Sequence, residues 1–210
     1  MARRNILVFI KQLKRPVFTT LELKNSSGKS LSAVTQALNY LEKQGLILKV
    51  YHGIWVEASS GRIDIYSIIP FLFPRQRAYL SFVSALHLYG IIEQIPQVIT
   101  LASISHSKTM HTKLGTFSVH QINPLFFKGF DWYKKEGSFL IAEQEKALVD
   151  CLYLSAFKKN QFSFFPELHF SSSFDFKKAE KWVKFIPNPK IRLNVQEKLK
   201  SISRNKLKYA

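Results

Sequence analysis

Hydrophobic and polar positions between residues 30 and 45 repeat with the period of an α-helix that has two different sides. The positions on the apolar side are Leu31, Val34, Leu38 and Leu41. The positions on the polar side are Ser32, Thr35, Gln36, Asn39 and Lys43. Ser30 can cap the start of this helix with its hydroxyl, and Gly45 can adopt the left-handed conformation that ends it. Because hydroxyl and amide side chains can bind base edges in the major groove of DNA, the pattern predicts a recognition helix.

Two further helices are expected before the recognition helix. Residues 6–13 carry apolar side chains at helical spacing, and Pro16 ends that helix. Thr19 and Glu22 form a capping-box pattern, which predicts the start of a short second helix. The side chains expected on the buried side of this second helix are Leu21 and Leu23.

A β-hairpin is expected after the recognition helix, because residues 46–50 and 54–56 are short apolar runs on either side of a turn at 51–53. Three helices followed by a hairpin are typical of the winged helix-turn-helix, in which the third helix enters the major groove. The residues expected at base edges are Ser32, Thr35, Gln36 and Asn39. The residues expected on the DNA backbone or in the adjoining minor groove are Lys29, Ser30, Lys43 and the wing residues Lys49, Tyr51 and His52.

Two other interpretations of this pattern stay open: three helices and a hairpin also form protein–protein docking modules, and a polar helix side can simply be hydrated. Charge favours DNA, because residues 1–60 contain nine Lys or Arg and three acidic residues, a surplus of six. We therefore predict that residues 1–60 form a winged helix-turn-helix DNA-binding domain.

The whole chain is strongly basic, with a net charge of +17 and a pI near 10.0. This charge implies attraction to nucleic acid or to an anionic membrane surface. No apolar run is long enough to span a bilayer, and residues 6–10 are too short an apolar stretch for a signal peptide, so we expect no membrane partner and a cytoplasmic location. The single cysteine, Cys151, excludes an internal disulfide.

Residues 61–210 are expected to form a second, mixed domain, which makes the whole chain α+β. Its first residues, 62–74, are expected to be an extended connector. The helices expected next span residues 81–89 and 143–157, and the strands include residues 97–103, 115–120 and 139–141. The apolar stripe expected in the second of these helices consists of Ala147, Leu148, Cys151, Leu152 and Leu154.

Three segments of this second domain resemble the abortive-infection antitoxins of the AbiEi type. Residues 84–100 read SALHLYGIIEQIPQVIT, and residues 114–130 contain LGTF followed by INPLFFKGF. The third segment, residues 141–150, reads IAEQEKALVD and resembles that family's IAxPEKALLD. The segments occur in the family's order, and the resemblance covers roughly residues 5–155. One departure is Gln144, which stands where the family has proline.

The resemblance implies a winged helix-turn-helix domain joined to a C-terminal domain that carries antitoxicity. It implies an antitoxin of a type IV toxin–antitoxin system, active in abortive phage infection, that represses its own operon by binding double-stranded promoter DNA at inverted repeats. The implied functional partner is a nucleotidyltransferase-like toxin, without a stable complex between the two proteins. The alternative is a ligand-responsive winged-helix transcriptional regulator that has no toxin partner.

No catalytic residue, metal site or cofactor is expected. The histidines His106, His111 and His120 have no cysteine or carboxylate at a metal-ligand spacing, so exposed or hydrogen-bonded histidines account for them better. Glu143, Glu145 and Asp150 could pair as catalytic carboxylates, but acidic groups at a helix start and local pairing are the simpler explanation.

The C-terminal residues 166–210 form a basic helical end, with eleven Lys or Arg and four acidic residues. Two amphipathic helices are expected there, separated by residues 187–189. The basic residues expected on their outward side are Lys177, Lys178, Lys181, Lys184, Lys190, Arg192, Lys198 and Lys200. A hydrated surface and a role on DNA phosphates or on a toxin-bound RNA explain this charge equally well.

Overall fold

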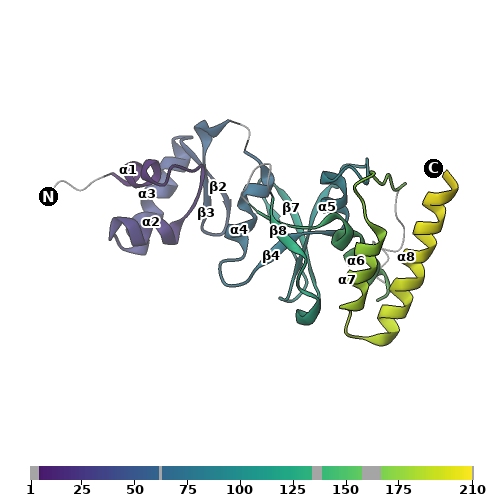
Figure 1. The fold of residues 1–210 in the computed structure, drawn as a ribbon. Helices are drawn as coiled ribbons and strands as arrows, with labels where there is room; N and C mark the ends of the chain where they lie inside the picture. The colour runs from purple at the N-terminus through teal and green to yellow at the C-terminus, as the bar shows by residue number, and fades with distance from the viewer. Residues whose placement is uncertain (1–4, 62, 134–138, 158–166, 210) are drawn as a thin grey trace. The chain divides into compact units, whose positions relative to one another are not determined.

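The computed structural model describes residues 5–61, 63–133, 139–157 and 167–209, and it confirms the α+β class (Figure 1). The chain divides into two compact units. The first unit comprises residues 1–74 and 111–115, and the second comprises residues 75–110 and 116–210. Residues 61–74 therefore group with the first unit, whereas the sequence analysis assigns them to the second domain. The boundary between separately folding domains stays a prediction.

The first unit contains helices and a three-stranded antiparallel sheet in the order β1-β3-β2. Its elements are α1 (Ile6–Gln12), β1 (Val17–Thr19), α2 (Thr20–Ser27), α3 (Leu31–Lys43), β2 (Ile47–Tyr51) and β3 (Ile54–Glu57). Strand β1 was not predicted, because three residues are too few to show an alternating pattern. This strand forms through its partner, with Val17 opposite Val56 and Thr19 opposite Ile54.

The core of this unit lies between the three helices and the sheet. Its buried members are Ile6, Ile10, Phe18, Leu23, Val34, Leu38, Leu41, Ile47 and Trp55. Two expected members are exposed: Leu21 by 59% and Leu31 by 52%. Leu21 is two positions from the buried Leu23, so the two side chains lie on opposite sides of a helix. Leu31 is the first residue of α3 and precedes the buried part of the helix, which begins at Val34.

The start of α2 and both ends of α3 are the ones that the sequence predicts. The end of α2 is not, because the helix continues to Ser27 through residues 25–27, which were expected to break it. Thr19 and Glu22 form the capping box of α2, with each side chain bonded to the other residue's backbone N–H. The hydroxyl of Ser30 accepts from the backbone N–H of Ala33 at the start of α3. Gly45 follows α3 with a positive φ of 71°, which a glycine adopts without strain. The direction in which α3 leaves the loop is thus fixed by local sequence.

The prediction of an extended connector at residues 62–74 is wrong, because residues 65–72 are helical. The short helices in this region are η1 (Ala58–Ser60), η2 (Ile65–Ile68) and α4 (Ile69–Leu72). Asp64 caps η2 by accepting from the backbone N–H of Tyr66. Pro70 lies in the first turn of α4, where a missing N–H costs nothing, and the helix buries Ile69 and Leu72.

A mixed sheet with the strand order β6-β7-β5-β4-β9-β8 among the described residues belongs mostly to the second unit, although the end of β6 and the first residue of β7 group with the first. Its strands are β4 (Ala78–Leu80), β5 (Val98–Ser103), β6 (Lys108–Thr112), β7 (Gly115–Gln121), β8 (Phe130–Trp132) and β9 (Leu140–Ala142). The pairs β5–β7 and β4–β9 are parallel, and β4–β5 and β8–β9 are antiparallel. The expected strands at β5, β7 and β9 are confirmed, while β4, β6 and β8 were missed.

The helical elements of this unit are α5 (Phe82–Leu88), η3 (Pro124–Phe126), α6 (Gln144–Ser155), α7 (Phe176–Lys184) and α8 (Pro189–Tyr209). The sequence predicts the α-helices of this unit that the structure describes. In Figure 1, α6, α7 and α8 lie side by side, and each of the three contacts the other two. α5 contacts both β5 and α6. None of the helices within the described ranges is long and apolar enough to cross a bilayer.

A glycine before β8 allows close packing of α7 against this strand. Gly129 has a φ of 79°, and a Cβ built on it would lie 2.7 Å from a ring carbon of Trp182. We expect Gly129→Ala to lower the free energy of unfolding by about 1–3 kcal/mol more than Gly90→Ala does. Gly90 is the matched control, since it has a φ of 71° and open space around it. Chemical denaturation of the two variants measures the difference, and equal destabilisation would contradict the close contact.

Candidate functional site

The polar stripe of α3 consists of Ser32, Gln36, Asn39 and Lys43, which are all exposed. These positions fall within about 60° of one another around the helix axis. They lie away from Val34, Leu38 and Leu41, which bury the other side of α3 in the core. Gln36, Asn39 and Lys43 make no hydrogen bond or ion pair through their side chains within the residues described. Their donors and acceptors therefore face solvent and are free for another molecule.

Two of the other expected contact residues on α3 are already occupied. The hydroxyl of Thr35 donates to the carbonyl of Leu31 at 2.8 Å, and this residue is only half-exposed. The hydroxyl of Ser30 caps α3 and lies 3.1 Å from the hydroxyl of Ser32. Thr35 and Ser30 thus contribute more to the helix itself than to its exposed surface.

The hairpin turn of the first unit is tied to the start of α2. The backbone N–H of Thr20 donates to the carbonyl of Gly53 at 2.9 Å, and the indole N–H of Trp55 donates to the hydroxyl of Thr20 at 2.8 Å. At the turn, the rings of Tyr51 and His52 meet edge to face with centroids 4.9 Å apart. These bonds hold the turn in a fixed position relative to the helices.

Lys49 is less available than expected from the sequence. It is half-buried, and its ammonium group lies 5.4 Å from the centroid of the Trp55 ring. Its backbone N–H donates to the carboxylate of Glu42 on α3. Burial alone would raise the pKa of Glu42, but this bond and the ammonium group of Lys113 lower it overall. Lys49 therefore joins the hairpin to α3 through its backbone while its side chain packs on Trp55.

Several lysines between residues 5 and 60 have no acidic partner in the part of the chain that the structure describes. Each of the three carboxylates in this region has a basic partner: Arg15 for Glu22, Lys11 for Glu57 at 2.6 Å and Lys113 for Glu42 at 3.1 Å. The lysines of this region with no carboxylate partner within the described ranges are Lys14, Lys24, Lys29 and Lys43. Two of these, Lys29 and Lys43, flank the two ends of α3. An anionic partner of α3 would therefore meet unneutralised charge at both ends of the helix.

Tyr40 is an exposed residue of α3 that the sequence analysis did not select. It is 61% exposed, lies one turn after Gln36 and makes no hydrogen bond in the part of the chain that is described. An aromatic residue outside the apolar stripe of a helix is the signal that could have found it. Tyr40 extends the stripe with a flat apolar surface and a hydroxyl.

A buried ionic cluster lies at the start of α6 in the second unit. Lys146 and Asp150 form an ion pair, and both side chains are fully buried. Asp150 also accepts from the hydroxyls of Ser81 at 2.7 Å and Tyr79 at 3.1 Å. Burial is the main cause that raises the pKa of Asp150 and lowers that of Lys146. The local pairing expected for Asp150 is confirmed, whereas the burial of Lys146 was not predicted.

The cluster is closed on every side that the structure describes. The ammonium group of Lys146 lies 3.7 Å from the centroid of the Phe126 ring and 3.1 Å from the hydroxyl of Tyr79. Beside it, burial raises the pKa of the Cys151 thiol well above its ordinary value, which disfavours the reactive thiolate. The arrangement joins α6 to β4 and leaves no group of the cluster facing a ligand.

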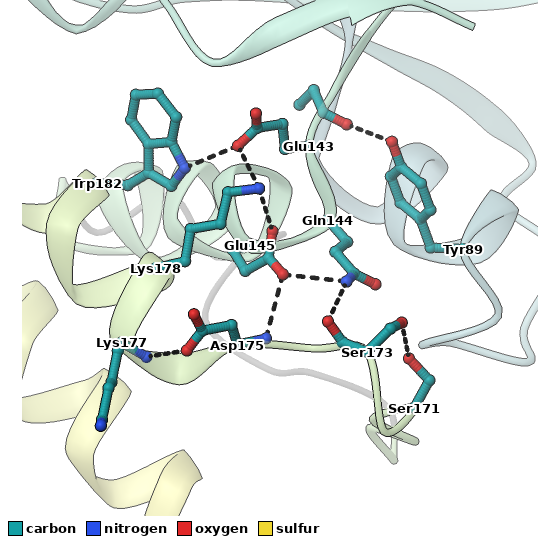
Figure 2. Close-up of polar contacts among 11 residues, drawn as sticks. Tyr89, Glu143, Gln144, Glu145, Ser171, Ser173, Asp175, Lys177, Lys178 and Trp182 are labelled. Carbon is teal, nitrogen blue, oxygen red and sulfur yellow. Dashed lines mark hydrogen bonds and ion pairs between the residues drawn. The ribbon is translucent and has the colours of Figure 1, made fainter. Parts of the chain in front are cut away.

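A second polar network joins α6 to α7 (Figure 2). The ammonium group of Lys178 lies 3.1 Å from the carboxylate of Glu143 and 3.5 Å from that of Glu145. Glu143 also accepts from the indole N–H of Trp182, and Glu145 from the backbone N–H of Asp175. Burial alone would lower the pKa of Lys178, but the two carboxylates raise it overall. Glu143 and Glu145 are therefore used to position α7.

The basic outward face expected over α7 and α8 is smaller than the sequence suggests. Lys178 pairs with the two carboxylates, Lys198 donates to the hydroxyl of Ser155 at 2.8 Å, and Arg192 donates to the carbonyl of Pro187. The members that are exposed are Lys177, Lys181, Lys184, Lys190 and Lys200. Sequence periodicity could not separate Lys178 and Lys198 from the exposed lysines, because their partners lie more than 30 residues away in the sequence, whereas the bond of Arg192 is local.

The three histidines lie in different surroundings. His106 and His111 are exposed, whereas His120 is buried and its ring lies 3.1 Å from the hydroxyl of Ser118. No group of three or more metal-ligating side chains comes together in the described ranges.

Comparison of the chain with protein-family models gives no match, and comparison with curated proteins gives none either. A function for this chain is therefore inferred from its own residues.

Removing one partner of the buried ion pair should destabilise the second unit severely. We expect Lys146→Met to lower the free energy of unfolding by about 3–5 kcal/mol, because it leaves the carboxylate of Asp150 buried without its counter-charge. The double variant Lys146→Met with Asp150→Leu should recover most of this loss. Urea denaturation checks both, with Lys198→Met as the control for a lysine that contacts α6 at its surface. A double variant less stable than the single one would contradict the argument.

Stability should fall at high pH partly through Tyr89. Its hydroxyl donates to the carbonyl of Ala142 at 2.8 Å, and burial, with the nearby Tyr133, Glu143 and Glu145, raises its pKa from 10.0 to about 12. The folded protein then holds this proton more tightly than the unfolded chain, so the contribution is complete below pH 10 and is lost as the pH rises towards 12.

We expect Tyr89→Phe to flatten the loss of unfolding free energy over this pH range, measured by urea denaturation at a series of pH values. Tyr40→Phe is the matched control, because Tyr40 is exposed and its hydroxyl makes no bond in the described part of the chain. If the pH profile of Tyr89→Phe is unchanged, Tyr89 does not contribute to the loss of stability at high pH.

Proposed function

We propose that the first unit is a winged helix-turn-helix that binds promoter DNA, with α3 in the major groove and the β2–β3 hairpin as its wing. One observation carries the proposal: the polar stripe of α3 is exposed and has unused donors and acceptors, while the opposite side of α3 is fixed in the core. Amide side chains such as Gln36 and Asn39 can make paired hydrogen bonds to adenine. Lys29 and Lys43 at the ends of the helix support binding to phosphates.

We further propose that the protein is an antitoxin that represses its own operon and counteracts a nucleotidyltransferase-like toxin. The three antitoxin-like segments, at residues 84–100, 114–130 and 141–150, support this part of the proposal. Autoregulation fits the first part, since a repressor of its own operon must recognise one specific sequence. An operator made of inverted repeats requires two copies of α3, supplied by a dimer or by two monomers.

Binding of the purified chain to its own upstream region tests the proposal directly. Fluorescence anisotropy at about 150 mM salt compares this DNA with a scrambled duplex of equal length. Tight binding to the upstream region alone is expected from a repressor. Equal and salt-sensitive binding to both duplexes would mean that only the net charge of +17 is recognised, and would contradict the proposal.

Gln36→Ala should weaken binding to the operator by about 1–3 kcal/mol and leave binding to scrambled DNA almost unchanged. The reason is that a bond to a base edge discriminates between sequences, whereas a phosphate contact does not. Gln44→Ala is the matched control, because Gln44 is an exposed amide at the end of α3 outside the stripe. The same anisotropy assay measures both variants. Equal weakening of binding to both duplexes would contradict the placement of α3 in the major groove.

A further inference from the structure

One side of α7 brings together exposed lysines and aromatic rings. The helix buries Ala179 and Val183, and Ile186 just beyond its end is also buried. The exposed residues on the other side are Lys177, Glu180, Lys181, Lys184 and Phe185, with the partly exposed Trp182 next to them. We call this set, together with Lys128, the α7 surface. All of its members belong to the second unit.

The centre of the α7 surface is the ring of Phe185, which is 47% exposed. The ammonium group of Lys128 lies 4.4 Å from the centroid of this ring, and the Trp182 ring lies 5.6 Å from it at an angle of 43°. Trp182 is itself held by its bond to Glu143 (Figure 2). Its ring also packs against Gly129, where a Cβ would lie 2.7 Å from it. An exposed ring and a cation thus stand together on a rigid support.

The lysines of the α7 surface carry charge that the protein does not neutralise. Lys128, Lys177, Lys181 and Lys184 have no carboxylate partner among the residues described. Glu143 is already bonded to Lys178 and Trp182, and Asp175 caps the helix. Glu180 is the only acidic residue within α7. The partner that complements this surface is therefore an anion, and the exposed ring requires a flat apolar group on the same partner.

We propose that the α7 surface binds a single-stranded nucleic acid, with a base stacked on Phe185 and phosphates on Lys128, Lys181 and Lys184. Stacking of bases on aromatic side chains beside a basic groove is how proteins bind single strands without sequence preference. A duplex suits the surface less well, because its bases are stacked on one another and cannot reach the ring. The inference is independent of the proposed operator binding, which uses α3.

The test measures binding of the full chain to labelled RNA and DNA single strands of the same mixed sequence, and to the corresponding DNA duplex, at about 150 mM salt. Phe185→Ala should weaken single-strand binding roughly 5- to 150-fold, and Phe185→Trp should retain it. Leu193→Ala is the matched control, since Leu193 is 61% exposed on the neighbouring helix α8. If RNA and DNA bind equally, the surface recognises the shared base and phosphate chemistry; if one binds more tightly, that strand is the ligand.

Charge gives a second readout that does not depend on the ring. Lys181→Ala and Lys184→Ala should each reduce the salt dependence of single-strand binding by about 0.7 in log–log slope, while the exposed Lys200 on α8 serves as the control. Gln36→Ala should leave single-strand binding unchanged, so failure of one proposal is visible without the other. Unchanged affinity in Phe185→Ala with an unchanged salt slope in the lysine variants would overturn the inference. Binding to phosphatidylserine vesicles but to neither single strand would also overturn it, in favour of a membrane surface.

Discussion

The second unit depends on one buried ion pair, between Lys146 and Asp150. Two charges inside a protein are tolerated only if they are paired and their remaining hydrogen-bonding capacity is used. Here the hydroxyls of Tyr79, in β4, and Ser81, just after it, donate to the carboxylate of Asp150. These bonds hold α6 against one strand of the sheet. The start of α6 then holds α7 through Glu143 and Glu145. The position of the α7 surface thus follows from a cluster deep in the core.

In the first unit, packing of α3 in the core determines which of its side chains are exposed. α3 has to bury one side among α1, α2 and the sheet, and the other side is then exposed by geometry alone. The Trp55–Thr20 bond fixes the hairpin turn, and Glu42 joins the middle of β2 to α3 by accepting from the backbone N–H of Lys49. Recognition of any partner by α3 and the turn would therefore require little rearrangement of this unit, which lowers the entropic cost of binding.

Local patterns allowed much of this fold to be predicted from the sequence. The capping box at Thr19, the cap at Ser30 and the helical spacing of Val34, Leu38 and Leu41 act within a few residues of one another, and all were found. Strand β1 and the helices at residues 65–72 were not found, because burial against distant residues decides them. The same reason explains why the burial of Lys146 was not predicted and why Lys198 was expected on the outward basic side: their partners are set by the tertiary structure.

The two helices α3 and α6 place opposite evolutionary constraints on their residues. Along α3, the residues that pack in the core and those that face solvent are separate sets, so Ser32, Gln36 and Asn39 can be exchanged singly without loss of packing. A lineage could thus acquire a new target while the fold of the first unit persists. Along α6, replacing Lys146 or Asp150 alone leaves the other charge buried without its partner, so the two positions have to change together. Among homologues, the stripe of α3 should therefore vary freely and the pair in α6 should covary.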